Sequence, residues 1–213
     1  MKFCVIGLGR LGYQVATTLA ENGMEVMAVD SNESIIAAIR DHVTQAICMR
    51  VTDDHSLRSI GVDEMDTVIV AMGENFAQSI LVTALLKKKL KIPYVIARAI
   101  DDIHSEILKL VGADQYILPE REVGIRLADN LSTPFMDLVR LDENFSVSQL
   151  MAPDWLVGKK IEEVDFAHSF GIQCIGIKQE NNIVDISPQH VITKTDKLIL
   201  SGSNDRLEQF ANK

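Results

Sequence analysis

The sequence predicts an α/β protein in which a doubly wound parallel sheet is followed by a small α+β domain. Apolar strand-like runs alternate with helical segments six times over about the first 118 residues. The turn between the first run and the first helix is rich in glycine. After Ser132-Thr133-Pro134 the pattern changes to short strand-like runs separated by turn residues. We therefore expect two domains, residues 1–134 and residues 135–213.

The glycine-rich turn has the spacing of a dinucleotide-binding motif. Gly7, Gly9 and Gly12 follow an apolar run and open a helical pattern that continues to about Ala20. Asp30 lies 18 residues after Gly12, at the end of the next apolar run. This order of strand, turn, helix, strand and acid is far more specific than three glycines alone. The first domain is therefore expected to be Rossmann-like.

Each glycine of this turn has a physical role. Gly7 permits the tight turn, Gly9 lets a phosphate approach the backbone, and Gly12 lets the helix pack close to the strand. Asp30 is expected to accept hydrogen bonds from ribose hydroxyls and to repel a 2′-phosphate, which disfavours NADP. The alternative is a turn whose glycines serve packing only. The nucleotide-binding residues expected within the turn are Gly7, Leu8, Gly9, Arg10, Leu11 and Gly12.

The elements after the first helix follow in regular order. Val26–Asp30 is the second strand, and Ser31 or Asn32 caps a helix that ends near Arg40. Gln45–Met49 is expected as a short third strand.

The middle of the first domain contains the most continuous apolar run. Thr52 or Asp53 caps a brief helix over Ser56–Ile60. Thr67–Met72 is apolar along most of its length, as expected of a central parallel strand. Gly73–Asn75 then leads into a long helix that ends near Lys89.

Two further strands complete the predicted sheet. Tyr94–Ala97 is the fifth strand, and Asp101-Asp102 opens a helix that ends near Leu110. Gln115–Leu118 is the sixth strand, and the helix Pro119–Leu131 follows it.

Ligands of doubly wound sheets lie beyond the carboxyl ends of the strands. Beyond the glycine turn, the candidate binding residues are those that follow the second to sixth strands. They are Asp30, Ser31, Asn32, Val51, Thr52, Asp53, Ala71, Met72, Gly73, Asn75, Arg98 and Glu120.

The remainder of the chain predicts a small α+β domain of a size that often self-associates to bury enough apolar surface. Its strands are expected at Met136–Leu141, Phe145–Leu150, Gln173–Lys178, Ile183–Ile186 and Lys197–Ser201. The turns are expected at Pro153-Asp154, Asn181-Asn182 and Ser187-Pro188. Short helices are expected at Val157–Ile161 and Asp205–Ala211.

Composition narrows the classes of function. The net charge of −9 disfavours a nucleic-acid partner. Cys4, Cys48 and Cys174 are far apart in apolar runs and are expected to be buried thiols in a reducing compartment. The longest apolar stretch, near Ile80–Leu86, is shorter than the roughly 20 residues that span a bilayer. We also expect no signal peptide, because the first residues run directly into a strand, so the protein is expected to be cytoplasmic.

Several of these segments together resemble one family of regulatory proteins. They are Val5–Gly12 with its G-x-G-R-x-G turn, Glu25–Asp30 with Asn32, Val68–Gly73, Lys109–Asp114, Pro119-Glu120 and Lys197–Gly202. In these segments the chain resembles the RCK or KTN domain family, the cytoplasmic regulatory subunits of Trk- and Ktr-type potassium transporters. The resemblance covers essentially the whole chain, and its single pair of domains is similar to the Ktr arrangement.

The resemblance implies a cytoplasmic gating subunit with no catalytic residues. Its first domain would bind ATP or ADP, with NAD or NADH as further ligands. It would form a homo-oligomer, a dimer-based ring of eight, on a membrane potassium-translocating subunit of Ktr or Trk type. That partner would hold it peripherally at the inner face of the membrane. Nucleotide exchange would then control potassium transport.

The resemblance also gives individual residues expected roles. Arg10 is expected to reach an outer phosphate, although a solvent-facing arginine is the alternative. Asp30 and Asn32 would hold the ribose. Thr52 and Asp53 would border the adenine or simply cap a helix.

Two residues that follow the fifth and sixth predicted strands each have two alternative roles. Arg98 would meet phosphates or remain a surface arginine. Glu120 would bind a metal ion, such as Mg²⁺ between adjacent triphosphates, or simply favour the first turn of a helix.

Two other functions compete with the gating subunit. An NAD-dependent oxidoreductase would need a positioned proton donor, and the second domain offers only His168 and His190. A nucleotide-binding adaptor for another membrane protein is the third possibility. Some relatives bind a cyclic dinucleotide in the second domain, but small or polar residues, Ala167 and His168, replace the usual arginine here. No metal-ligand spacing links the five histidines.

Overall fold

The computed structural model describes residues 1–73, 75–179 and 182–213. The chain forms two compact units, residues 1–120 and residues 121–213. The expected boundary after residue 134 stays a prediction. Within the described residues, no helix is both long and apolar enough to cross a membrane.

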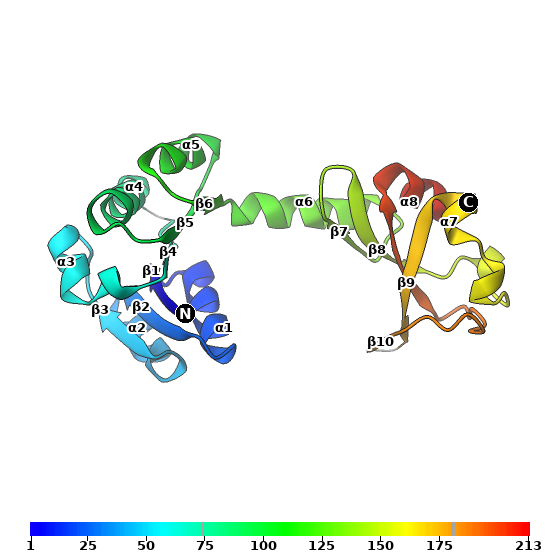
Figure 1. Cartoon of the computed structure of the whole chain (residues 1–213), viewed down its shortest axis with the longest axis horizontal. Helices are drawn as coiled ribbons and strands as arrows, with labels where there is room; N and C mark the ends of the chain where they lie inside the picture. The colour runs from blue at the N-terminus through cyan, green and yellow to red at the C-terminus, as the bar shows by residue number, and fades with distance from the viewer. Residues whose placement is uncertain (74, 180–181) are drawn as a thin grey trace. The chain divides into compact units, whose positions relative to one another are not determined.

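The first unit contains a six-stranded parallel sheet in the order β3-β2-β1-β4-β5-β6 (Figure 1). Its strands are β1 (Lys2–Ile6), β2 (Glu25–Asp30), β3 (Gln45–Cys48), β4 (Thr67–Val70), β5 (Tyr94–Arg98) and β6 (Gln115–Ile117). Its helices are α1 (Arg10–Glu21), α2 (Glu33–Ile39), α3 (Asp54–Ser59), α4 (Phe76–Ala84) and α5 (Asp102–Val111). The predicted doubly wound fold is confirmed, and the strand order reverses between β1 and β4.

Helices cover both faces of this sheet, with α1 and α2 on one face and α3, α4 and α5 on the other (Figure 1). Side chains of β1 alternate between the two apolar cores, as the period of a strand requires. Val5 packs with α1 and α2, whereas Cys4 and Ile6 pack in the core that includes Leu57, Val82 and Leu108. The near-continuous apolar strands of the sequence follow from this double burial.

Short helical segments complete the first unit. They are the 3₁₀ turns η1 (Arg40–His42) and η2 (Val62–Glu64) and the π-helical segment η3 (Leu85–Leu90). The long helix expected after Asn75 therefore has two parts, α4 and η3. It ends at Lys91, which adopts the left-handed conformation with φ of 60°.

The second unit contains a five-stranded antiparallel sheet in the order β10-β9-β11-β8-β7. Its strands are β7 (Asp137–Arg140), β8 (Phe145–Met151), β9 (Ile172–Gln179), β10 (Asn182–Val184) and β11 (Lys197–Ser203). Its helical elements are α7 (Phe166–Phe170), α8 (Asn204–Ala211) and the 3₁₀ turns η4 (Asp154–Leu156) and η5 (Ile161–Glu163), and α6 (Pro119–Ser132) begins at the end of the first unit. The small α+β fold is confirmed; the turn expected at Asn181-Asn182 includes Asn181, which lies outside the described residues.

One helix of the second unit was predicted wrongly. The helix expected at Val157–Ile161 does not form: residues 157–160 are not helical, because their backbone pairs with the segment around Ile192, and Ile161 begins η5. The N–H of Gly158 donates to the carbonyl of Ile192 at 2.8 Å, and the N–H of Ile192 donates to the carbonyl of Lys159 at 2.9 Å. This tertiary pairing outweighs a local helical pattern.

The helix α7 was not predicted, although its end signals stand in the sequence. The Asp165 carboxylate accepts a hydrogen bond from the N–H of His168 at 3.0 Å, and Gly171 ends the helix in the left-handed conformation.

A glycine contact sets the distance between α1 and β1. A methyl group at Gly12 would lie 1.9 Å from the carbonyl oxygen of Gly7, closer than any two nonbonded atoms approach. It would also lie 3.1 Å from the side chain of Ala71. The helix therefore packs against the turn that begins it only if Gly12 has no side chain.

We expect Gly12→Ala to lower the free energy of unfolding of the chain by about 2 kcal/mol or more, because α1 must move away from β1. Gly9→Ala is the matched control, since a methyl group at Gly9 meets nothing within 4 Å, and it should cost less than about 1 kcal/mol. Urea denaturation of the two variants measures the difference. Equal losses would contradict the close-packing role of Gly12.

Candidate functional site

The main hollow at the carboxyl edge of the parallel sheet has a volume of about 680 Å³. It lies where β1, β2, β3 and β4 end, on both sides of the reversal in strand order. Its lining residues are Ile6, Gly7, Val29, Asp30, Ser31, Cys48, Met49, Arg50, Val51, Met72 and Gln78. This is the place where doubly wound sheets bind ligands.

The carboxylate of Asp30 fixes the shape of the glycine turn. Its Oδ2 accepts a hydrogen bond from the N–H of Leu8 at 2.6 Å. Its Oδ1 accepts one from the N–H of Asn32 at 2.8 Å. Each carboxylate oxygen accepts up to two hydrogen bonds, so both oxygens can still accept a hydrogen bond from a hydroxyl group of a ligand in the hollow. Asp30 can thus shape the turn and bind a ribose at the same time.

The N-terminus of α1 presents free backbone donors beside this carboxylate. Gly9 is the capping residue, and no described side chain caps the helix or places a carboxylate in its first turn. The space where a Cβ of Gly9 would stand is empty. Uncapped N–H groups at the positive end of a 12-residue helix favour an anion.

Arg10 is the first residue of α1 and is exposed. Together with Leu8 and Gly9 it lines a second hollow of about 420 Å³, to which α2 contributes Ile35. Its guanidinium bonds to no described residue, so it is available to an anion in this region.

Arg98 and Glu120 lie together, away from both hollows. The guanidinium of Arg98 donates a hydrogen bond to the carboxylate of Glu120. It also covers Gly73, where a Cβ would lie 2.1 Å from its Nη1 atom. The Arg98 Nε atom is buried without a partner among the described residues. Neither residue lines either hollow, and each is engaged with the other in this structure.

Three predicted binding residues cap helices instead of lining the hollow. Asp53 accepts a hydrogen bond from the N–H of Ser56 at 2.7 Å, and hydrogen bonds from the Ser56 backbone and side chain lower the pKa of Asp53. Asn32 accepts from the N–H of Ser34 at 3.0 Å. Asn75 caps α4 in the same way.

The remaining predicted residues flank the site. Gly12 and Ala71 are buried behind the turn, and Leu11 packs on the core beneath it. Thr52 is exposed next to Val51 and lines neither hollow. Among the described residues no group of three or more potential metal ligands exists, so a metal at Glu120 stays a prediction.

Six lining residues of this hollow were missed. Ile6 and Val29 lie at the ends of β1 and β2, and Cys48, Met49 and Arg50 end or follow β3, so the rule that ligands bind beyond strand ends would have found them. Gln78 lies in the first turn of α4 and has no signal in the sequence. Its Nε2 donates to the carbonyl of Val51 at 2.9 Å, which ties α4 to the end of β3.

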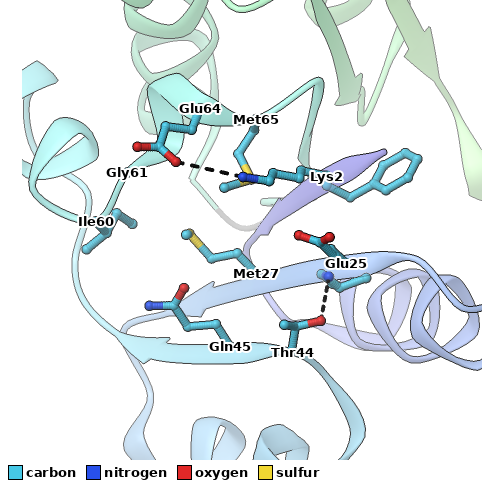
Figure 2. Close-up of a pocket in the computed structure, with 11 residues that line it drawn as sticks. Lys2, Glu25, Met27, Thr44, Gln45, Ile60, Gly61, Glu64 and Met65 are labelled. Carbon is cyan, nitrogen blue, oxygen red and sulfur yellow. Dashed lines mark hydrogen bonds and ion pairs between the residues drawn. The ribbon is translucent and has the colours of Figure 1, made fainter.

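A different hollow of about 340 Å³ lies at the opposite, amino edge of the sheet. Figure 2 shows Lys2, Glu25 and Gln45 around it, with Met27 between them and Met65 beside Lys2. The ammonium of Lys2 lies 3.8 Å from the carboxylate of Glu64 (Figure 2). With its cation already beside an acid, this hollow is less suited to a phosphate than the glycine turn.

Two family models and several known proteins match this chain. The TrkA-N domain model matches residues 3–119, and the TrkA-C domain model matches residues 149–213. The Ktr system potassium uptake protein A of Bacillus subtilis (strain 168) is 33% identical over 213 residues, which cover 99% of this chain and 96% of that protein.

Solved structures share the fold. The crystal structure of the GsuK RCK domain superimposes with a TM-score of 0.71 at 18% identity, over 100% of this chain and 48% of that chain. The crystal structure of GsuK bound to ADP superimposes with a TM-score of 0.53 at 25% identity, over 61% of this chain and 33% of that chain. This chain thus spans about half or less of these two structures.

The exposure of the three cysteines provides a probe of the site. Cys48 is exposed, so the prediction that it is buried is wrong; it ends β3, which is an edge strand of the sheet. Burial raises the pKa of the Cys4 thiol to about 12 and that of Cys174 to about 11.

We expect a disulfide reagent at pH 8 to modify Cys48 rapidly in the folded chain and Cys4 and Cys174 only after unfolding. The absorbance of the thiolate released from the reagent gives the number of cysteines that react in the fast phase. Cys48→Ser should remove this fast phase. A fast phase that survives in Cys48→Ser would contradict the burial of the other two thiols.

Proposed function

Because this chain belongs to the family built from a TrkA-N and a TrkA-C domain, we propose that it is a regulatory subunit of a potassium uptake system. It binds an adenine nucleotide in its first unit and controls a membrane potassium-translocating subunit of Ktr or Trk type. It is not an enzyme. It is cytoplasmic and lies peripherally at the inner face of the membrane through that partner.

One observation carries the nucleotide part of the proposal. The uncapped N-terminus of α1 lies next to Asp30, whose carboxylate holds the glycine turn through the N–H of Leu8. A phosphate suits the first group and a ribose hydroxyl suits the second. ATP, ADP, NAD and NADH all contain this pair of groups, and the related GsuK was solved bound to ADP.

An oxidoreductase is the weaker alternative, because the histidines with resolved partners are engaged in other contacts. His190 Nε2 bonds to Asp196 at 2.7 Å, and His168 Nδ1 bonds to Asp165 at 2.9 Å. Both pairs lie within the second unit, and neither includes a cysteine or a second acid that would complete a proton relay.

Exposed apolar side chains support self-association. On α6, Val123, Leu127 and Leu131 recur every four residues and are exposed, so they form one apolar stripe. On α5, Ile103 and Leu110 are also exposed. Such surfaces suit further copies of this chain, and we infer a dimer-based octameric ring by analogy with the family.

A bound triphosphate would also change the pairing of Arg98 with Glu120. An acid near several phosphates requires a cation to be stable there. We therefore infer that Mg²⁺ between adjacent triphosphates binds Glu120, while Arg98 turns to a phosphate. Binding of ATP should then be tighter with Mg²⁺ than without it.

Nucleotide binding itself is tested with the full chain. We expect ADP and NAD to slow the modification of Cys48, because this thiol lines the hollow. Gly9→Ala should weaken ADP binding at least tenfold with little loss of stability, since the methyl group fills the space that a phosphate needs. Calorimetry measures the affinity. No binding of any of the four nucleotides, or unchanged affinity in Gly9→Ala, would contradict the site.

The role of Arg10 is tested by comparing a nucleotide that has three phosphates with one that has a single phosphate. Arg10→Ala should weaken ATP binding about tenfold and AMP binding much less, because the guanidinium contacts an outer phosphate. Arg40→Ala is the control, since Arg40 is also exposed but lines neither hollow. Equal losses for ATP and AMP would show that Arg10 does not contact the outer phosphates.

A further inference from the structure

His104 lies in α5 and is completely buried. Its Nδ1 accepts a hydrogen bond from the N–H of Ile100 at 3.3 Å. Its Nε2 lies 2.8 Å from the hydroxyl oxygen of Ser79, and that hydroxyl donates to the carbonyl of Phe76 at 3.0 Å. Because Nδ1 accepts and the hydroxyl proton is used, Nε2 must carry the proton. All of these groups are satisfied only when the imidazole is neutral.

This network holds the first turn of α4. The imidazole ring lies 4.4 Å from the ring of Phe76, centroid to centroid, so His104 contacts both Phe76 and Ser79. Gln78, one of the two residues between them on the helix, lines the nucleotide hollow and bonds to the carbonyl of Val51. Through Phe76 and Ser79, His104 therefore stabilises the turn of α4 that places Gln78 in the lining of the hollow.

A second proton would break this support. It would place an Nδ1–H against the N–H of Ile100, so two donors would face each other in a buried space. Burial lowers the pKa of His104, and the nearby charge of Asp101 opposes that effect. The neutral form is thus retained at pH values somewhat below the ordinary histidine pKa of about 6.5 and is lost as the pH falls through the lowered pKa of His104.

The charges around the imidazole offer little compensation. The packed helix α4 contains no charged residue. At the N-terminus of α5, the carboxylate of the capping residue Asp101 accepts a hydrogen bond from the backbone N–H of His104 at 2.7 Å, and Asp102 is the first residue of the helix. At the end of β5, Arg98 is paired with Glu120. Among these described groups only the aspartates favour a charged imidazole.

We propose that His104 is a positioning residue of the nucleotide site, and that its protonation loosens the first turn of α4 and weakens nucleotide binding. The subunit would then respond to acidification as well as to nucleotide. This inference rests on the proposed function, because it assumes that the hollow beside Gln78 takes the nucleotide.

The test uses NAD as the probe, because none of its groups titrates between pH 5 and pH 7.5. In the wild-type chain we expect the dissociation constant for NAD to rise about threefold or more from pH 7.5 to pH 5. His104→Gln retains an N–H donor but does not titrate, so its affinity should vary much less. His42→Gln, which replaces an exposed histidine, should follow the wild-type profile. Circular dichroism confirms that each chain stays folded.

A second measurement needs no variant. If the neutral form binds NAD more tightly, NAD must lower the pKa of His104 by the same coupling, which the imidazole resonances report in an NMR titration. Identical titrations with and without NAD, or a flat affinity profile in a wild-type chain that binds NAD, would overturn the inference. Failure of the wild-type chain to bind NAD, ADP or ATP at pH 7.5 would instead overturn the proposed function.

Discussion

The two hydrogen bonds that Asp30 accepts, from Leu8 and Asn32, are the interaction on which the site depends. They join the glycine turn after β1 to the end of β2, so the N-terminus of α1 points to one fixed place. The absence of a side chain at Gly12 allows α1 to reach that place. A regulatory protein needs such a rigid phosphate site, because only a fixed site lets the ligand move the elements around it.

Single side-chain contacts hold the other side of the hollow. The wall formed by α4 is held by hydrogen bonds through two side chains, from Gln78 to Val51 and from His104 to Ser79. Each is a single contact that a ligand or a proton can alter. The ion pair of Arg98 and Glu120 lies outside the two hollows. We infer that a nucleotide that alters the contacts of Gln78 or His104 shifts α4, whose exposed apolar side chains, like those of α5, suit contact with further subunits.

The sequence predicted the features that depend on local patterns. The alternating runs predicted the parallel sheet because its strands are buried on both faces, and the spacing of Gly7, Gly9 and Gly12 placed the turn correctly. Contacts between distant segments could not be predicted in this way. Gln78 and His104 are ordinary residues in the sequence, and their roles depend on what the fold places opposite them. Arg98 and Glu120 were both expected near the site, but their pairing with each other was not predicted. The helix wrongly predicted at Val157–Ile161 has the same origin, because the backbone of this segment pairs with Ile192.

The central claim is that nucleotide bound at the glycine turn controls potassium transport. It is tested most directly by potassium uptake into vesicles that contain the membrane subunit together with this chain, with and without nucleotide inside. We expect the wild-type chain to make uptake respond to nucleotide, whereas the Gly9→Ala chain should still associate with the vesicles but give no response. An equal nucleotide response with the wild-type chain and with Gly9→Ala would contradict it.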